Sequence, residues 1–413
     1  MRAPFPKNRQ FYKFCLYGFF KNLKFFEPFF LLFFIAKGLS FLEIGGLYSI
    51  RQLTIFLMEI PTGIVADSLG RKRTIIMSFG LYIVSFLVFF AYHTYPFFIL
   101  GMILFSLADA SRSGTHKAMI LEYLRMRGLE KYRIDYYGAT RACSQKGSAL
   151  SALIAAAIVF FSNNYEVIFL FSIIPLLINM LLVASYPKEV DGTIRKKRFL
   201  TNFRQQFRSL IASLQKKKTL FIYFTIASFS GYYKESKDYI QVIIKSFAIT
   251  VPITFIAVDN HQKSTIFIGV IFFLIYLLTS AASKYAFKVN RMFMDKMLAL
   301  NSLLVIGSFM GLIAGILFYF KYYWVSLLFF VTIYLIENVR KPIGVAIIAD
   351  NFKQKMMATN LSVESFLKTI ISTGVAMGMG ILADHFGVGM ALAIISALLL
   401  LLSVVFFRGM KRI

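Results

Sequence analysis

Long apolar stretches constrain the fold of this chain more than any other feature of its sequence. A helix needs ~20 predominantly apolar residues to cross the hydrocarbon core of a bilayer, and stretches of about that length recur throughout the chain. We identify twelve of them, over residues 11–36, 43–66, 74–92, 97–122, 136–161, 166–186, 218–249, 264–284, 296–319, 323–348, 359–382 and 386–407. In lipid every backbone polar group must be hydrogen-bonded within the protein, which a helix achieves by itself. The sequence therefore predicts an all-α integral membrane protein with twelve transmembrane helices.

The composition excludes most soluble classes of protein. Hydrophobic residues make up 58% of the chain and charged residues 16%, whereas soluble domains average ~45–50% and ~25%. The two cysteines, Cys15 and Cys143, lie in apolar stretches without the spacing of a zinc site or a disulfide framework. The sequence contains no phosphate-binding loop and no Ser/His/Asp or metal-ligating constellation. We therefore expect no enzyme activity, no metal and no cofactor.

The distribution of charge predicts the orientation of the chain. Lys and Arg number 46 against 19 Asp and Glu, which gives a formal net charge of +27, and the basic residues gather in alternate loops. Basic loops stay in the cytoplasm, so both termini are predicted to be cytoplasmic. The same rule explains the charge without a nucleic acid partner. The longest loop, 187–217, belongs to this basic set.

The chain also contains an internal repeat. Residues 18–24, Gly-Phe-Phe-Lys-Asn-Leu-Lys, match residues 231–237, Gly-Tyr-Tyr-Lys-Glu-Ser-Lys. Asp109-x-x-Arg112 in the fourth span matches Glu337-x-x-Arg340 in the tenth. Two halves of six helices in the same orientation form a parallel repeat, with a binding site expected near the middle of the membrane. We predict an N-terminal half, a basic cytoplasmic linker and a C-terminal half over residues 1–186, 187–217 and 218–413.

Ionisable side chains inside the predicted helices indicate where this site lies. Each costs ~2.5–3.5 kcal/mol at mid-bilayer on insertion scales, so those that persist face a cavity or one another. Asp109, Arg112 and His116, for example, share one face of the fourth span. Cations outnumber acids among these groups, which favours an anionic or zwitterionic ligand. The candidate ligand-binding residues are Lys21, Lys24, Arg112, Lys234, Lys237 and Arg340.

The remaining groups are candidates for proton coupling. A carboxylate in a cavity of low dielectric constant can exchange a proton near neutral pH, and histidine does so in water. The candidates are Asp109, Glu337, Glu27, Glu59 and His116. For Asp109–Arg112 and Glu337–Arg340, an internal ion pair, a ligand contact and a coupling role all stay open. His116 has an equally simple alternative as a hydrogen-bonded residue in a helix interface.

A motif lies between the second and third spans. Residues 59–73 read Glu-Ile-Pro-Thr-Gly-Ile-Val-Ala-Asp-Ser-Leu-Gly-Arg-Lys-Arg. This segment resembles the signature loop of the major facilitator superfamily, G-x-x-x-D-x-x-G-R-[KR], and lies on the predicted cytoplasmic side, as that loop does. Its EIPTG-x-x-AD-x-x-GRK form is similar to that of a bacterial subgroup. Together with the repeat and the basic central loop, the resemblance covers the whole chain.

The resemblance implies secondary transport by alternating access in the bacterial cytoplasmic membrane, with a small molecule, a proton and membrane lipid as partners, and we expect a monomer. It places the first, fourth, seventh and tenth helices around a central cavity, and these helices carry most of the charges named above. The loop residues expected to gate the cycle are Gly63, Asp67, Gly70, Arg71 and Lys72. Gly63 would permit close helix packing, Gly70 a tight turn, and Asp67 a contact with the positive end of a helix.

The leading functional hypothesis is a proton-coupled transporter of a small anionic or zwitterionic organic molecule. Drug exporters of the family usually carry a Gly-Pro-rich motif in the fifth helix, where this chain has no proline from Gly147 to Ile154. A multidrug exporter and a membrane scaffold or sensor without transport stay open as alternatives. A second, shorter match to the motif, from Gly380 to Gly387, lies outside in the predicted topology and lacks the basic tail. We interpret that match as a chance likeness.

Overall fold

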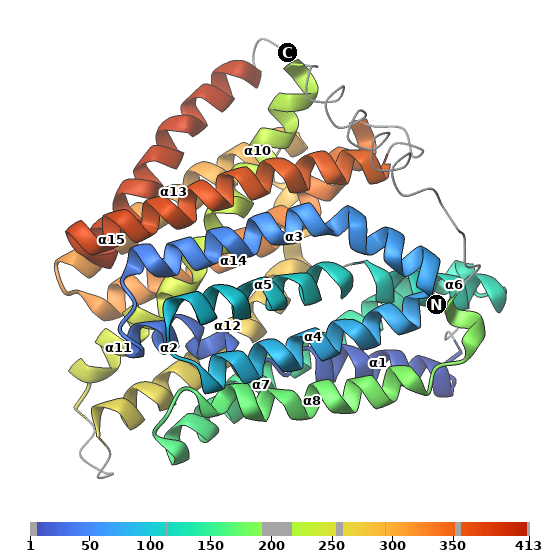
Figure 1. Cartoon of the computed structure of the whole chain (residues 1–413). Coiled ribbons are helices and arrows are strands. Elements are labelled where there is room, and N and C mark those ends of the chain that lie inside the picture. The colour runs from blue at the N-terminus through green and yellow to red at the C-terminus, as the bar shows by residue number, and fades with distance from the viewer. Residues whose placement is uncertain are drawn as a thin grey trace. The chain divides into compact units, whose positions relative to one another are not determined.

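The computed structural model describes residues 6–112, 114–191, 217–252, 259–293, 295–351 and 357–410. Nearly all of them are helical, which confirms the prediction of an all-α protein (Figure 1). The elements before the central loop are α1 (Arg9–Lys21), η1 (Glu27–Phe29), α2 (Phe30–Ala36), α3 (Phe41–Leu69), α4 (Arg71–Ala91), α5 (Tyr95–Arg112), α6 (Thr115–Met126), η2 (Glu130–Tyr132), α7 (Arg133–Ser162), α8 (Val167–Ala184) and η3 (Lys188–Asp191). Those after it are α10 (Lys217–Ser236), η4 (Lys237–Tyr239), α11 (Ile240–Thr250), α12 (Asn260–Arg291), α13 (Lys296–Tyr319), α14 (Tyr323–Asn351) and α15 (Met357–Met410).

Eight helical segments within the described ranges are long and apolar enough to cross a membrane. They correspond to the expected spans three to six and eight to twelve, because α15 contains the last two. These two meet at Gly387, whose φ of 79° and ψ of 162° interrupt the helix. The expected first, second and seventh spans are helical too, but they are broken or carry charges. The number of twelve transmembrane helices stays a prediction.

The helices of the expected first and seventh spans each end within the repeated segments 18–24 and 231–237. α1 ends at Lys21, and helix resumes at η1, where Pro28 cannot continue an α-helix from upstream. α10 gives way to the 3₁₀ turn η4 before α11 begins. The break after α1 exposes backbone donors at the start of α2, and the Gln241 side-chain oxygen accepts from the N–H groups of Leu31 and Leu32 at 3.0 and 3.2 Å. A side chain thus satisfies donors that lipid could not.

The described residues form two compact units. Those of Met1–Phe29 and Thr54–Phe203 make up the first unit, and those of Phe30–Leu53 and Arg204–Ile413 make up the second. The unit boundary therefore falls inside the expected first and second spans, and α3 begins in the second unit and ends in the first. The division at 1–186 and 218–413 stays a prediction, because most of the expected linker, 192–216, lies outside the described residues.

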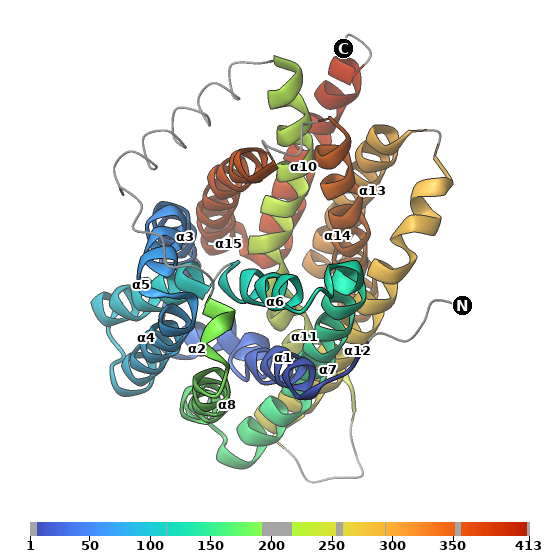
Figure 2. The ribbon, with the colours of Figure 1, turned by 90° about the vertical axis from the view of Figure 1, so that its right-hand side faces the viewer.

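Helices of the first unit pack closely through glycine. A Cβ on Gly147 of α7 would lie 2.3 Å from the carbonyl oxygen of Phe19 in α1, and one on Gly18 would lie 2.7 Å from the Ser144 hydroxyl oxygen. Figure 2 shows α1 beside α7, and Figure 1 shows α4 between α5 and α8. Small residues let helix backbones approach without a hydrophobic driving force. The short distance between α1 and α7 is therefore set by these two glycines.

The second unit repeats this arrangement and adds a seam of small residues. A Cβ on Gly231 of α10 would lie 2.8 Å from Ile371 in α15, so the repeated glycine again faces a neighbouring helix (Figure 2). The seam joins the first half of α3 to α15, where a Cβ on Gly45 would lie 2.5 Å from the carbonyl oxygen of Ala376, and one on Gly380 2.5 Å from that of Phe41. At these points the two backbones touch.

Asp384 closes one end of this seam. Its two carboxylate oxygens accept hydrogen bonds from the backbone N–H groups of Phe41 and Leu42, both at 2.8 Å. The Ser40 hydroxyl accepts from the next N–H, that of Glu43, at 3.2 Å. The first three orphan donors of α3 are thereby satisfied. The second, shorter match to the signature motif, from Gly380 to Gly387, therefore has a structural role, because its Asp384 caps the start of α3.

Candidate functional site

The first unit contains a cavity of about 250 Å³ whose described lining is strongly basic. Its charged lining residues are Lys21 from α1, Arg112 from α5, Lys117 from α6 and Arg141 from α7, and no Asp or Glu is among the described residues that line it. The rest of the described wall is mostly aromatic or hydroxylated and consists of Phe14, Tyr17, Gly18, Gly114, His116, Ile120, Tyr137, Thr140 and Ser144. Lys117 lies over the Tyr137 ring, 4.9 Å from its centroid. The cavity can therefore neutralise negative charge but not positive charge.

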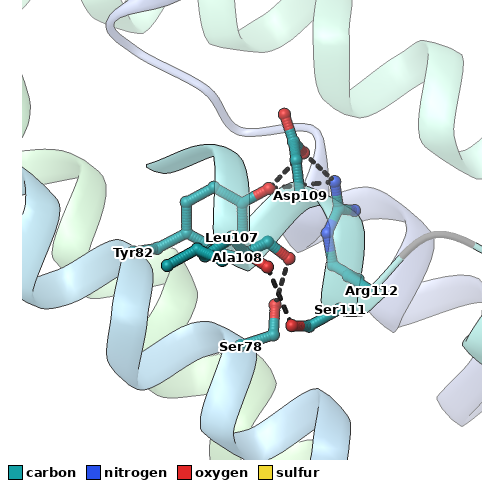
Figure 3. A network of polar contacts seen from close by, with 7 residues as sticks. All are labelled: Ser78, Tyr82, Leu107, Ala108, Asp109, Ser111 and Arg112. Atoms are coloured by element: carbon teal, nitrogen blue, oxygen red, sulfur yellow. Dashed lines mark hydrogen bonds and ion pairs between the residues drawn. The ribbon is translucent and has the colours of Figure 1, made fainter. Parts of the chain in front are cut away.

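Arg112 is the most constrained of these cations. It is the last residue of α5, and the chain turns at Gly114, whose φ of 71° favours glycine. Its Nη2 donates to an Asp109 carboxylate oxygen at 2.9 Å and to the Tyr82 hydroxyl at 3.3 Å (Figure 3). Tyr82 in turn donates to the same Asp109 oxygen. The ion pair that the i,i+3 spacing suggested between Asp109 and Arg112 is present.

The Arg112 guanidinium retains unused donors. The side chain is only 10% exposed, and its buried Nε and Nη1 have no hydrogen-bond partner among the described residues. A buried donor without a partner costs free energy that a bound acceptor recovers. Arg112 lines the cavity, so an anion there would meet the positive charge of a guanidinium that is held in place by Asp109 and Tyr82.

His116 forms part of the cavity wall and is packed among aromatic rings. Its ring stacks on Tyr17 with 3.5 Å between centroids and 9° between planes. Its Nε2 lies 3.1 Å from the Tyr186 hydroxyl, and Phe14 meets it edge-on. These contacts are those of a residue in a helix interface, the alternative that the sequence left open. Its expected coupling role stays a prediction.

Lys21 ends α1, and Lys24 lies within the break that follows it. Both line a second, smaller cavity of about 20 Å³ in the first unit, together with Arg112 and Tyr82. A space of this size holds about one water molecule. Lys21 therefore borders both cavities, and ending α1 at this residue places its side chain beside Arg112.

The second unit has its own cavity, of about 270 Å³, with a mixed lining. Its charged lining residues are Lys234, Glu337, Arg340, Lys341, Glu364 and Lys368. Arg340 is 2% exposed, donates through Nη2 to the backbone oxygen of Thr225 at 3.1 Å and lies 4.7 Å from the Phe229 ring centroid. Glu337 accepts from the Ser230 hydroxyl at 2.7 Å. In the described part of the chain no ion pair joins Glu337 to Arg340, and each side chain has another partner, so of the three alternatives left open for this pair the internal ion pair is not found.

Lys234 joins this cavity to a buried bridge that the sequence analysis did not find. Its ammonium donates to the side-chain oxygen of Gln52 in α3, and the Gln52 amide nitrogen donates to Glu235 at 2.6 Å. Gln52 and Glu235 are each 2% exposed. A single glutamine in an apolar helix gives little signal in sequence. The i, i+4, i+7 spacing of Gly45, Ser49 and Gln52, which puts them on one face of α3, is the pattern that could have indicated it.

Three other predicted site residues lie outside these cavities. Lys237, in η4, pairs with the adjacent Asp238 at 2.8 Å. Glu27 begins η1 and is half-buried, and Glu59 of α3 is exposed. None of them is among the lining residues of the cavities described above. Their expected roles stay predictions.

The signature loop makes local contacts in the first unit. Gly70 has a φ of 97°, which permits the turn between α3 and α4. The Lys72 backbone N–H donates to the Asp191 carboxylate at 2.5 Å, and its ammonium donates to the Tyr186 backbone oxygen at 2.9 Å. Asp191, which the sequence analysis missed, therefore caps the start of α4.

For the other predicted residues of the signature loop, Arg71, Gly63 and Asp67, the structure gives little that bears on a gating role. Arg71 donates weakly to the Ala118 backbone oxygen at 3.4 Å. A Cβ on Gly63 would meet nothing within 4 Å among the described residues, so the expected close helix contact at Gly63 is not found there. The side chain of Asp67 lies outside what the structure describes. The gating role of the loop stays a prediction.

Comparison with known proteins identifies a family. The family model of the Major Facilitator Superfamily matches residues 14–363. The MFS-type transporter YxaM of Bacillus subtilis (strain 168), itself uncharacterized, is 32% identical over 90 residues, which are 22% of this chain and 23% of that protein. The sucrose permease of Escherichia coli is 31% identical over 157 residues, 35% of each chain. These alignments span about a quarter to a third of the two relatives.

Solved structures share the fold. The crystal structure of the nucleoside transporter NupG matches with a TM-score of 0.72 and 13% identity, covering 97% of both chains. That of a peptide transporter POT in complex with sulfate matches with a TM-score of 0.72 and 12% identity, covering 100% of this chain and 96% of that one. The matched family is one of membrane transporters, which confirms the expectation that this chain is not an enzyme.

Proposed function

Because the chain belongs to the Major Facilitator Superfamily, we propose that it is a secondary transporter that moves a small anionic or zwitterionic organic molecule across the bacterial cytoplasmic membrane by alternating access. The single observation that supports a negatively charged substrate is the basic lining of the cavity in the first unit. Among the described residues that line this cavity are four cations and no carboxylate. A negatively charged group is attracted into such a cavity, and a positively charged one is repelled from it.

The second cavity supplies a carboxylate suited to proton coupling. Glu337 is 7% exposed, and one of its oxygens is buried without a hydrogen-bond partner among the described residues. A buried carboxylate in this position is stabilised by a proton and destabilised by losing it. Asp109 is a weaker candidate, because its carboxylate is already engaged by Arg112 and by the Tyr82 hydroxyl.

Alternating access requires a contact that opens and closes, and the seam between α3 and α15 has the features of one. It is narrow, because Gly45 and Gly380 allow backbone contact, and it is closed by two hydrogen bonds that a single side chain, Asp384, accepts from backbone N–H groups. Contacts of this kind have two discrete arrangements rather than a range of intermediate ones. We propose that the seam separates when the transporter opens on that side.

The remaining parts of the proposal follow the topology. Twelve membrane-spanning helices in two halves with cytoplasmic termini account for the alternation of basic loops. The signature loop, held by Asp191 at the start of α4, lies on the cytoplasmic side in this topology. The coupling ion is a proton, and the transporter acts as a monomer in membrane lipid.

Transport by purified protein in proteoliposomes tests this function. Small organic anions, zwitterions and lipophilic cations are screened as substrates, and the best one is measured in wild type and in Lys21→Ala. We expect this substitution to abolish uptake while the protein stays folded, since Lys21 pairs with no acidic group in the described part of the chain. Lys288→Ala, which removes the same charge from a residue near the end of α12 that is not among the lining residues of either cavity, serves as the control. Undiminished uptake by Lys21→Ala, or uptake of lipophilic cations alone, would contradict the proposal.

A further inference from the structure

The packing of α1 against α7 brings together the only two cysteines of the chain, Cys15 and Cys143 (Figure 2). They lie more than 100 positions apart, and nothing in the sequence indicates that they meet. In the first unit the Cys143 side chain lies within hydrogen-bonding reach of the Cys15 thiol. Both thiols are free; Cys15 is 8% exposed, and Cys143 is half-buried. Two free thiols that meet inside one unit can form a covalent bond.

Contacts on either side of Cys15 hold it on the face of α1 that meets α7. One turn before it, the Phe11 ring meets Tyr136 of α7 edge-on, with 5.0 Å between the ring centroids. One turn after it, a Cβ on Gly18 would lie 2.9 Å from the backbone oxygen of Thr140. Residues three or four apart share one face of a helix. The second cysteine follows Thr140 by three positions, so both thiols lie along the line of contact between the two helices.

The same interface is close enough for side chains as short as cysteine to reach each other. One turn after Cys143, a Cβ on Gly147 would lie 2.3 Å from the carbonyl oxygen of Phe19, so the backbones of α1 and α7 are in contact at this level. A disulfide bond needs two Cβ atoms within ~3.5–4.5 Å, which helices separated by large side chains do not provide. The glycines therefore keep the two thiols at short range.

We propose that Cys15 and Cys143 are a modification site, which closes to a reversible disulfide bond by exchange with a low-molecular-weight disulfide such as oxidised glutathione. The more exposed Cys143 attacks first as its thiolate and forms a mixed disulfide with one glutathione, while the other glutathione leaves and takes up a proton. The Cys15 thiolate then attacks the Cys143 sulfur, forms the internal bond and releases the second glutathione, which is also protonated. The two cysteines are oxidised, and one glutathione disulfide is reduced to two thiols.

The predicted topology indicates why this bond is reversible. Both cysteines lie near the cytoplasmic start of their expected spans, 11–36 and 136–161. Disulfides on the reducing side of a membrane are mostly transient and respond to the redox state of the cell. The site is therefore expected to be reduced under ordinary conditions and to close under oxidative stress.

The bond ties together two walls of the basic cavity in the first unit. Phe14, which precedes Cys15, and Ser144, which follows Cys143, both line that cavity. A covalent link between α1 and α7 prevents these walls from separating or sliding, whereas alternating access requires packed helices to change their arrangement. Resting on the function proposed above, we expect oxidation to lower uptake.

Treatment of the solubilised protein with oxidised glutathione tests the pairing. Because the chain has two cysteines, a monomer that has lost both thiols without gaining glutathione must contain this bond. We expect both thiols to disappear together, the intact mass to fall by that of two hydrogens, and dithiothreitol to restore both thiols. Retention of the thiols, a stable glutathione adduct on either cysteine, or a disulfide-linked dimer would overturn the proposal.

Two variants test whether the register of the helices causes the pairing. Cys15→Ser should stop at the glutathione adduct on Cys143, because the second attacking thiol is missing. Cys15→Ser combined with Leu16→Cys moves the thiol to a position that is 45% exposed and lies on another face of α1. This variant should also stop at the adduct. If it forms an internal disulfide as readily as the wild type, the argument from register is wrong.

Uptake into proteoliposomes measures the consequence of the bond. The oxidised wild type should lose most of its uptake of the best substrate from the screen described above, and dithiothreitol should restore it. Cys143→Ser should show neither the loss nor the recovery. Undiminished uptake by protein whose thiols are fully closed would refute the effect on the cavity. If the reduced protein takes up none of the compounds, the proposed function fails, and the thiol and mass measurements alone decide the existence of the site.

Discussion

Asp384→Asn tests whether one side chain holds the seam between α3 and α15. In the wild type both carboxylate oxygens accept from the first N–H groups of α3 at 2.8 Å. Asparagine keeps one acceptor oxygen and turns an NH₂ group toward the other N–H. One capping hydrogen bond is then lost at an exposed helix end, which costs ~0.5–2 kcal/mol, and the lost charge removes ~0.3–1 kcal/mol of interaction with the helix dipole. We expect the closed seam to lose about 2 kcal/mol, a roughly 30-fold shift toward the open arrangement.

The rate of cysteine labelling measures this shift. Ser49 lies in the seam, is 6% exposed and donates to the Gly45 backbone oxygen at 2.8 Å, so a cysteine at this position reacts with a maleimide only when the seam opens. The Ser49→Cys protein should therefore label roughly 30-fold faster with Asp384→Asn than without it. The protein without Ser49→Cys gives the background from its native cysteines.

Asp259→Asn provides the matched control for this experiment. Asp259 caps α12 within its own segment by accepting from the Gln262 N–H at 2.7 Å, so the same substitution there weakens a cap without touching the seam. We expect no change in labelling. If Asp384→Asn labels no faster than the wild type, the carboxylate does not hold the seam closed and the reasoning is wrong.

Three further predictions follow from packing and charge. Gly147→Ala should destabilise the protein by ~1–3 kcal/mol in thermal unfolding, because its Cβ would overlap a backbone oxygen. A Cβ on Gly138 of the same helix would meet nothing within 4 Å among the described residues, so Gly138→Ala should be neutral or stabilising. Equal changes in stability for Gly147→Ala and Gly138→Ala would refute the packing argument. Gln52→Leu should lower stability by ~1–3 kcal/mol, since the buried Glu235 loses its amide donor. An unchanged melting temperature would count against a stabilising role of the Gln52–Glu235 hydrogen bond. Glu337→Gln should abolish uptake driven by a pH gradient but preserve substrate exchange across liposomes; gradient-driven accumulation by this variant would exclude Glu337 as the proton carrier.

The repeated Gly-aromatic-aromatic-Lys motif has one structural meaning in both units. Gly18 and Gly231 each face a neighbouring helix at short distance, and Lys21 and Lys234, three residues on, each line the cavity of their own unit. The helix is interrupted soon after the motif in both cases. Close packing at Gly18 and Gly231 therefore positions Lys21 and Lys234. The helix ends at or soon after each lysine.

Much of this protein was predictable from the chain alone. The length and spacing of apolar stretches identified the helical fold, because lipid leaves few other ways to satisfy the backbone. The rarity of charge in such stretches drew attention to Lys21, Arg112, Lys234 and Arg340, all of which line a cavity. Because an unpaired charge is costly in lipid, a charged residue within an apolar stretch is a strong indication of a functional or buried polar site in any membrane protein.

Tertiary structure decided which partner each polar group takes. Equal spacing suggested equal ion pairs at Asp109–Arg112 and Glu337–Arg340, yet only the first forms, because Ser230 and the backbone at Thr225 lie within reach of the second pair. The roles of Gln52 and Asp384 depend on residues 183 and more than 340 positions away. Sequence periodicity reports the face of a helix on which a residue lies, and only the packing of helices determines what that face meets.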